Sequence, residues 1–264
     1  MKMVFTTLQG GRKMKLLCAK KAYEMIEDSS TVGLGGGSTV ALIADLIAQG
    51  GKRVSVVTPS YDTEELCRAK GIDVLPLDQV NAVSVAFDGC DELDPNLDAL
   101  KSCGGIHTRE KIVAGMAESY VLLADETKVH ERLEFSFPVT LEVLPAAREL
   151  VRCRLEKMGA AVSMRKSPAK AGLAIGDDGG YLMEADFSQV MGAAEPAYGV
   201  RELSDTLDRL PGVIAMASSR ISRVQPSSQA PRACGSSESF RHRRRWPTRL
   251  FASRIRSRQS IEGT

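Results

Sequence analysis

Apolar and polar residues alternate along the first half of the chain in blocks that switch between helical and strand spacing. Residues 15–28 carry apolar side chains three and four positions apart, the spacing of a helix with one buried face. Further segments of helical spacing begin at residues 38, 61 and 107. The apolar runs between the helices are typical of buried strands and lie at 31–34, 52–58, 72–77, 82–87 and 120–125. Strands that alternate with helices predict a mostly parallel, doubly wound sheet.

From residue 138 the order of the predicted elements changes. A strand at 138–144 is followed by a helix, two strands, a second helix and a last strand at 213–218. This β-α-β-β-α-β order is the ferredoxin-like arrangement. We therefore expect an N-terminal extension over 1–13, an α/β domain with the candidate site over 14–137, and a smaller ferredoxin-like α+β lid domain over 138–218.

The composition changes abruptly at residue 219. The segment 219–264 is rich in arginine and serine, contains no lysine and has almost no apolar periodicity. Three interpretations stay open: a basic arm for nucleic acid or another anionic surface, a disordered tail that buries too little to fold, and a non-native segment made by a change of reading frame. The sudden loss of lysine favours the third, so we do not expect a nucleic-acid partner.

Composition places the chain among ordinary globular proteins. Of its 264 residues, 43% are hydrophobic and 26% are charged, and the formal net charge of +2 predicts no acidic partner. No stretch reaches the roughly 20 apolar residues of a membrane span, and the first residues lack the apolar core of a signal peptide. Six scattered cysteines without a CxxC pair indicate reduced thiols, so we expect a cytoplasmic protein.

The first candidate site is the glycine run of VGLGGGSTV, which joins a predicted strand to a predicted helix. Glycines let the backbone approach a ligand closely, and the N-terminus of a helix offers free N–H groups. Ser38 and Thr39 add hydroxyl groups, so Gly36, Gly37, Ser38 and Thr39 form a candidate phosphate loop. The spacing matches neither the dinucleotide nor the Walker A pattern. A plain strand-to-helix turn capped by Ser38 is the alternative.

The stretch FDGCDELDPN gathers four carboxylates, Asp88, Asp91, Glu92 and Asp94, directly after a predicted strand. Ligands of a doubly wound sheet bind at the carboxyl ends of its strands, where carboxylates can accept hydrogen bonds from sugar hydroxyls and transfer protons. Asp88 and Asp91 are the better candidates because they lie nearer the strand end. The spacing of a calcium loop is missing, and a solvated acidic turn is the alternative.

The stretch LKSCGGIHTREK brings a cation and another carboxylate to the acidic stretch. Lys101 and the backbone around Gly104 are suited to stabilising a developing oxyanion. Glu110 lies near the start of a helix, where a contact with the helix dipole is the alternative role. We expect His107 to be structural. After the next strand, Lys128 is a further candidate cation, with a plain surface lysine as the alternative.

Taken together, GLGGGST, DGCDELD, LKSCGGIHTREK and ADETK resemble, in order and spacing, the A-type ribose-5-phosphate isomerase family. The resemblance covers about residues 15–217. It implies interconversion of D-ribose 5-phosphate and D-ribulose 5-phosphate in the pentose phosphate pathway, without a metal or an organic cofactor. The implied partner is a small-molecule sugar phosphate, and the implied assembly is a homodimer or homotetramer.

The resemblance also implies roles for individual residues. Glu110 matches the proton shuttle of an enediolate mechanism, with Asp88, Asp91 and Lys101 as its catalytic partners. The implied substrate-binding positions are Gly36, Gly37, Ser38, Thr39, Asp88, Gly89, Cys90, Asp91, Lys101, Ser102, Cys103, Gly104 and Lys128.

Three features depart from the family pattern. Gly36 stands where the family usually has threonine, which removes one hydroxyl donor. Ser102 and Cys103 replace two glycines of the loop after Lys101. The segment 219–264 stands where the family usually returns a strand to the main sheet, so we expect one sheet edge to lack its strand.

Two other functions stay open. A sugar-phosphate sensor of related fold would bind its ligand without turnover, although such proteins usually carry an N-terminal helix-turn-helix. Another sugar-phosphate enzyme, such as an aminosugar-phosphate isomerase or a lactonase, would have different signatures and substrates.

Overall fold

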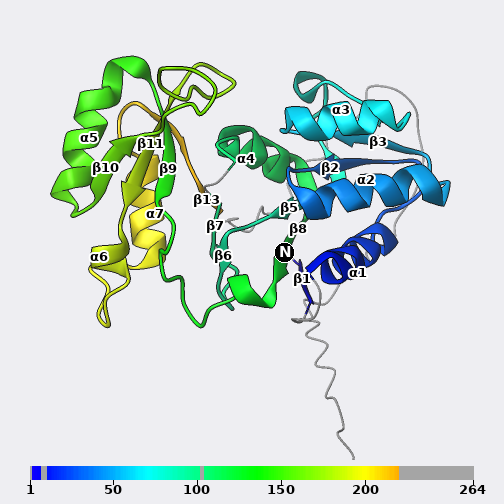
Figure 1. Ribbon diagram of the computed structural model, residues 1–264, viewed down its shortest axis with the longest axis horizontal. Helices are drawn as coiled ribbons and strands as arrows, with labels where there is room; N and C mark the ends of the chain where they lie inside the picture. Colours follow the sequence, from blue (N-terminus) through cyan, green and yellow to red (C-terminus); the bar gives the residue numbers. More distant parts are fainter. Residues whose placement is uncertain (1, 7–10, 102–103, 220–264) are drawn as a thin grey trace, which may run out of the picture.

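The computed structural model describes residues 2–6, 11–101 and 104–219 of the chain. Figure 1 shows two lobes, one built on a parallel sheet and one on an antiparallel sheet, with helix α4 (His107–Met116) between them. The predicted fold class, a doubly wound α/β domain with a smaller ferredoxin-like domain, is confirmed. Within the described ranges, no helix has the length and apolar character needed to cross a membrane.

The larger sheet has six parallel strands in the order β1-β8-β5-β2-β3-β4. Both of its faces are covered. Phe87 of β5 and Val121 of β8 belong to the core under α1 and α2, whereas their strand neighbours Ala86 and Leu122 pack on the α4 side. This two-sided burial explains the nearly continuous apolar runs. The strands are β1 (Lys2–Thr6), β2 (Ser30–Leu34), β3 (Val54–Val57), β4 (Asp73–Val74), β5 (Val83–Gly89) and β8 (Ala117–Asp125).

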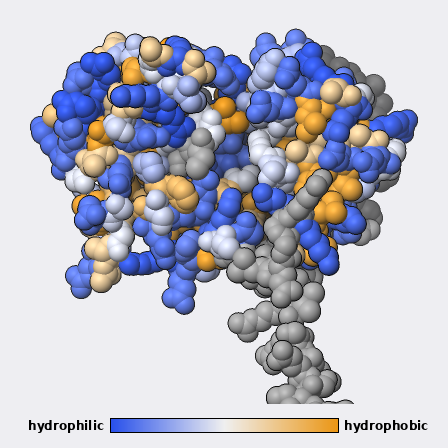
Figure 2. Space-filling view, viewed as in Figure 1, coloured by the Kyte–Doolittle hydropathy of each residue, from blue (hydrophilic) through white to orange (hydrophobic). Residues whose placement is uncertain are grey.

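Three further helices belong to this lobe: α1 (Gly11–Glu24), α2 (Ser38–Gly50) and α3 (Tyr61–Ala69). Helix α2 ends as predicted, because Gly51 takes the left-handed conformation with φ 74° that glycine adopts without a steric penalty. Hydrophilic side chains cover most of the face in Figure 2, and apolar side chains gather over α1 and α2, where Leu16 and Leu17 are exposed.

The structure adds detail to the predictions for this lobe at two places. Residues 2–6, which lie within the predicted extension of 1–13, form β1 and pair in parallel with β8 at the edge of the sheet. The three consecutive apolar residues of KMVFT are compatible with a strand. The strand predicted at 72–77 is only two residues long, because Pro76 cannot donate to the ladder and is followed by a short 3-10 helix, η1 (Leu77–Gln79).

The smaller sheet is antiparallel with the order β10-β11-β9-β12. On one face Leu141 packs with Leu155 and Leu203, while Thr140 and Glu142 point to the other face. The element order matches the ferredoxin-like prediction, while the exact domain boundaries stay a prediction. The elements are β9 (Val139–Val143), η3 (Pro145–Ala147), α5 (Arg148–Lys157), β10 (Ala161–Met164), β11 (Tyr181–Asp186), α6 (Ser188–Met191), α7 (Val200–Asp208) and β12 (Val213–Met216).

A third, three-stranded sheet joins the two lobes. It consists of β6 (Glu92–Leu93), β7 (Ala99–Leu100) and β13 (Ser218–Ser219) in the order β13-β7-β6. Directly after β7, the backbone N–H of Lys101 donates to the carbonyl oxygen of Ala217 at 3.0 Å. The segment that follows the small domain therefore supports the loop that carries Lys101. The predictions for 220–264 lie outside the described residues.

Candidate active site

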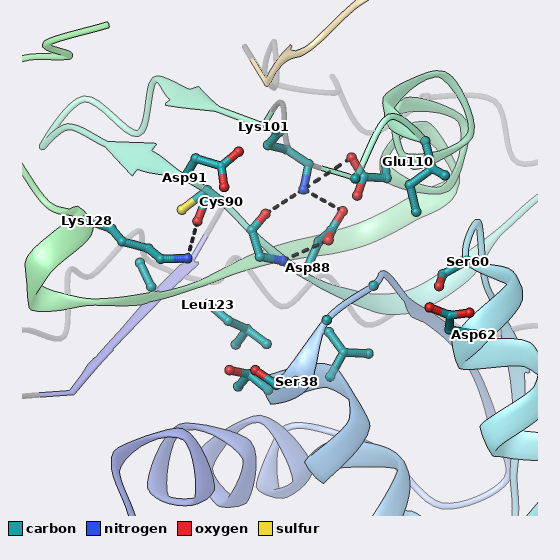
Figure 3. Close-up of a pocket in the computed structure, with 18 of the residues that line it drawn as sticks. Ser38, Ser60, Asp62, Asp88, Cys90, Asp91, Lys101, Glu110, Leu123 and Lys128 are labelled. Atoms are coloured by element: carbon teal, nitrogen blue, oxygen red, sulfur yellow. Dashed lines mark hydrogen bonds and ion pairs between the residues drawn. The ribbon is translucent and has the colours of Figure 1, made fainter. Parts of the chain in front are cut away.

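A pocket of about 490 Å³ lies at the carboxyl ends of β2, β5 and β8, the edge where a doubly wound sheet binds its ligands (Figure 3). Segments far apart in the sequence meet here, namely the turn after β2, the turn after β5, the start of α4 and the 3-10 helix η2 (Glu126–Lys128). Ser102 and Cys103 lie outside the described residues. The predicted residues that line the pocket are Gly36, Gly37, Ser38, Thr39, Asp88, Gly89, Cys90, Asp91, Lys101, Gly104, Glu110 and Lys128.

Three charged side chains, Asp88, Lys101 and Glu110, form a buried charge cluster on one wall of the pocket. Lys101 Nζ lies 2.9 Å from Asp88 Oδ2 and 3.4 Å from Glu110 Oε2. It also donates to the carbonyl oxygen of Gly89 (Figure 3). The side chains are only 8%, 4% and 12% exposed for Lys101, Asp88 and Glu110. Such a cluster is stable only because the cation has carboxylate partners within hydrogen-bond reach.

The environment of the charge cluster shifts the pKa values of Lys101 and Glu110. Burial alone would lower the pKa of Lys101, but the negative charges around it, with Asp88 the strongest, outweigh burial and raise the pKa well above its usual value. Burial raises the pKa of Glu110 from 4.5 to about 7, although Lys101 opposes this shift. A carboxyl group with a pKa near neutrality can both remove and return a proton.

The carboxylate of Asp88 is fixed from several sides. The hydroxyl of Tyr120 donates to Oδ2 at 2.9 Å, and the backbone N–H of Gly89 donates to Oδ1 at 2.8 Å. A Cβ atom at Gly35 would lie 2.1 Å from Asp88 Oδ1, so this position has no room for a side chain. Both oxygens of Asp88 are therefore held by fixed donors, and Oδ2 also faces Lys101.

The four carboxylates of the acidic stretch divide into two that line the pocket and two that have structural contacts. The two in the pocket are the ones nearer the end of the strand. Asp88 and Asp91 line the pocket. Glu92 is buried instead and accepts the backbone N–H groups of residues 134, 135 and 136. Asp94 closes a turn by accepting from the N–H of Asp98 at 2.9 Å. Among the described residues, no group of three or more His, Cys, Asp or Glu side chains is arranged to hold a metal ion.

The loop of residues 36–39, called the glycine loop below, forms the opposite wall. Gly37 is the N-cap of α2 with φ 98°, and no side chain caps the helix, so the alternative of a turn capped by Ser38 is wrong. Ser38 Oγ instead accepts from Lys15 Nζ at 2.8 Å. Uncapped N–H groups at a helix N-terminus, together with an ammonium group, form an anion-binding arrangement.

Two further predicted residues have clear places. Lys128 lines the pocket and donates to the carbonyl oxygen of Cys90 at 2.7 Å. His107 does not line the pocket. It is buried, its Nε2 faces the carbonyl oxygen of Ala215 at 3.2 Å, and burial lowers its pKa to about 4. The interpretation of His107 as a structural residue fits this geometry.

Several pocket residues were not predicted from the sequence. Lys15, Ser60 and Asp62 line the pocket, and Tyr120 holds Asp88. Ser60 and Asp62 follow the carboxyl end of β3, so the rule that ligands bind at strand ends could have found them. Lys15 and Tyr120 have no local signal, because one lies on a helix before the glycine loop and the other inside a strand.

Comparisons with known proteins indicate one family. Residues 55–218 match the family model of ribose 5-phosphate isomerase A (phosphoriboisomerase A). The chain is 37% identical over 205 residues to ribose-5-phosphate isomerase A of Methanothermobacter thermautotrophicus, covering 76% of this chain and 87% of that protein. It is 34% identical over 207 residues to the enzyme of the same name from Prochlorococcus marinus, covering 76% of this chain and 85% of that protein.

Solved structures give the same result. Ribose 5-phosphate isomerase A from Methanocaldococcus jannaschii superposes with a TM-score of 0.71 at 31% identity, covering 80% of this chain and 92% of that one. A D-ribose-5-phosphate isomerase in complex with phospho-erythronic acid superposes with a TM-score of 0.70 at 33% identity, covering 78% of this chain and 90% of that one. The chain described here belongs to the ribose 5-phosphate isomerase A family.

Proposed function

We propose that this protein interconverts D-ribose 5-phosphate and D-ribulose 5-phosphate, with Glu110 as the group that moves a proton between carbons 1 and 2. The observation that carries the proposal is the position of Glu110, whose Oε2 lies 3.4 Å from Lys101 Nζ, in a pocket whose other wall is the glycine loop. Membership of the family supports the choice of substrate.

The reaction divides between the two walls of the pocket. With the open-chain aldose bound, the Glu110 carboxylate removes the proton from carbon 2, and the electron pair moves onto the oxygen of carbon 1 to give an enediolate. The Lys101 ammonium stabilises the negative oxygen. Protonated Glu110 then delivers its proton to carbon 1, while the hydroxyl proton moves from oxygen 2 to oxygen 1. Asp88 and Asp91 relay that hydroxyl proton and bind the sugar hydroxyls in this proposal, which their position in the pocket lining supports.

The phosphate group binds at the glycine loop. Ser38, Thr39 and the uncapped N–H groups of α2 supply hydrogen-bond donors, and Lys15 and Lys128 supply positive charge. Holding the phosphate fixes carbons 1 and 2 at Glu110, so binding energy far from the reacting carbons contributes to the rate. The ligand of one related structure, phospho-erythronic acid, combines a phosphate and a carboxylate on a hydroxylated chain, the groups that these two walls would recognise.

The test is an isomerase assay on the full chain, after mass spectrometry has verified the C-terminal sequence of the purified protein. We expect ketose formation from D-ribose 5-phosphate without added metal. Binding of the sugar phosphate without turnover would instead support the sensor alternative. A panel containing an aminosugar phosphate and a sugar-phosphate lactone separates the other enzymes, because faster turnover of either would contradict the proposal.

A further inference from the structure

The first turn of α4 faces two ways. Glu110 points into the pocket toward Lys101, as Figure 3 shows. The residues around it contact the small domain, which lies on the other side of α4 in Figure 1. The small domain thus contacts the helix that carries the proposed proton shuttle, and one of its residues, Asp177, also reaches the pocket.

These contacts come from four separate segments of the small domain. Thr108 Oγ1 donates to Glu142 Oε2 on β9, and His107 Nε2 faces the carbonyl oxygen of Ala215 on β12. In addition, Arg109 Nη2 lies 2.9 Å from Asp178 Oδ1 and Lys111 Nζ lies 3.1 Å from Asp208 Oδ1.

The contacts differ in what they can contribute. The side chains of the Arg109–Asp178 and Lys111–Asp208 pairs are about a third to a half exposed, and exposed ion pairs contribute little to stability. Glu142 is 2% exposed and also accepts the N–H of Gly180 at 3.2 Å. A Cβ atom at Gly176 or Gly180 would lie 2.3 Å from an atom of Glu142, so the backbone packs closely around it. The Thr108–Glu142 hydrogen bond and the His107–Ala215 contact are therefore the links with buried partners, and only the first joins two side chains that can each be substituted.

We propose that Thr108 and Glu142 are positioning residues, through which the small domain holds the first turn of α4 so that Glu110 stays beside Lys101. This inference rests on the proposed function of Glu110. Neither Thr108 nor Glu142 lines the pocket, so any effect of these residues on the reaction is indirect, through the position of the first turn of α4. The expected effect is large, because a displacement of about 1 Å at a reacting group can cost on the order of 100-fold in rate.

The first test is Thr108→Val, which keeps the shape of the side chain and removes the hydroxyl. We expect kcat to fall about 10- to 100-fold with KM within about twofold of wild type. Thr108→Ser restores the hydroxyl and should restore most of kcat. Thr206→Val, on the exposed side of α7, is the matched control and should behave as wild type.

The second test reports on Glu110 without turnover. In protein with ¹³C-labelled glutamate carboxyl groups, the signal lost in Glu110→Gln identifies Glu110, and its titration is followed by NMR. The pKa of about 7 depends on burial, so a loosened first turn that admits water should lower it in Thr108→Val. This measurement separates the inference from the proposed function, since it applies equally to a protein that binds sugar phosphate without converting it.

Glu142→Gln keeps the positioning measurable if Thr108→Val does not fold, because the amide has the shape of the carboxylate. With its single oxygen accepting from the N–H of Gly180, its NH2 group can still donate to the Thr108 hydroxyl. A weaker hydrogen bond should lower kcat in the same direction by a smaller factor, again with KM unchanged. The inference is overturned if folded Thr108→Val or Glu142→Gln keeps both the wild-type kcat and the wild-type titration of Glu110.

Discussion

The two walls of the pocket bind charge by different means. On one wall, the charge cluster of Asp88, Lys101 and Glu110 is buried, and this burial and the charges shift the pKa values of Lys101 and Glu110. On the other wall, the glycine loop relies on backbone N–H groups and on the exposed ammonium group of Lys15. Chemistry at carbon needs shifted pKa values and therefore burial, whereas holding a phosphate needs only donors and positive charge.

This difference predicts unequal costs for losing a charge on either wall. When the partner of a buried ion is removed, the charge of that ion stays uncompensated inside the protein. When the partner of an exposed ion is removed, water takes its place. Changes in the charge cluster should therefore alter both turnover and stability. Changes at the glycine loop should alter substrate affinity and leave the fold intact.

The largest effect is expected for Lys101→Met. It leaves two buried carboxylates facing each other, so we expect the free energy of unfolding at neutral pH to fall by about 3–5 kcal/mol. Turnover should fall about 1,000-fold or more because the enediolate loses its cation. Urea unfolding and steady-state kinetics measure the two losses.

Lys70→Met is the matched control, since Lys70 pairs with Asp45 at 2.6 Å on the surface of the same domain. Its loss of stability should stay below about 1 kcal/mol, with normal turnover. Equal losses of stability in the two variants would contradict the distinction between the walls.

The next effect is a pH-dependent gain of stability in Glu110→Gln. The pKa of Glu110 is about 7 in the folded protein against 4.5 for an ordinary glutamate, so between these values the folded state binds more protons than the unfolded state. The wild type therefore loses stability as pH rises through this window, and the variant does not. The difference should reach about 3 kcal/mol above pH 7 and vanish below pH 4.5.

Unfolding curves at pH 4, 6 and 8 follow this difference directly. Glu149→Gln is a suitable control, because a hydrogen bond from Arg152 lowers the pKa of this exposed carboxyl group, and its small effect should have the opposite sign. A pH-independent difference between wild type and Glu110→Gln would show that Glu110 does not titrate as a buried acid.

The smallest effect is expected at the glycine loop, for Lys15→Met. Loss of one ammonium group should raise KM for the sugar phosphate about 10-fold with kcat within about threefold, since a charged hydrogen bond is worth about 1.5–3 kcal/mol. The effect should weaken at high salt. Lys20→Met, an exposed lysine of the same helix that does not line the pocket, is the control. A fall in kcat with unchanged KM would contradict a phosphate-binding role for Lys15.

The sequence predicted the parts of the site that depend on local chain geometry. A strand, a glycine turn and a helix follow one another directly, so the glycine loop could be placed without knowledge of the fold. The same holds for Asp88 and Asp91 after β5. The rule that carboxyl ends of parallel strands share one edge then brought these loops together.

The parts that depend on side-chain direction could not be predicted. Lys15 reaches Ser38 across 23 residues only because α1 packs on α2. Glu92 stands one residue after Asp91, yet it turns away from the pocket to accept three backbone N–H groups. The pairing of β1 with β8 was missed because a five-residue edge strand has too little periodicity to separate it from a loose extension.

The most direct test of the central claim is the fate of hydrogen at carbons 1 and 2 when the reaction runs in D₂O. We expect the wild type to incorporate solvent deuterium at carbon 1 of the ketose as it isomerises D-ribose 5-phosphate. Glu110→Gln should incorporate none at the same protein concentration, yet still bind phospho-erythronic acid. Deuterium incorporation at the wild-type rate in Glu110→Gln would contradict Glu110 as the proton carrier.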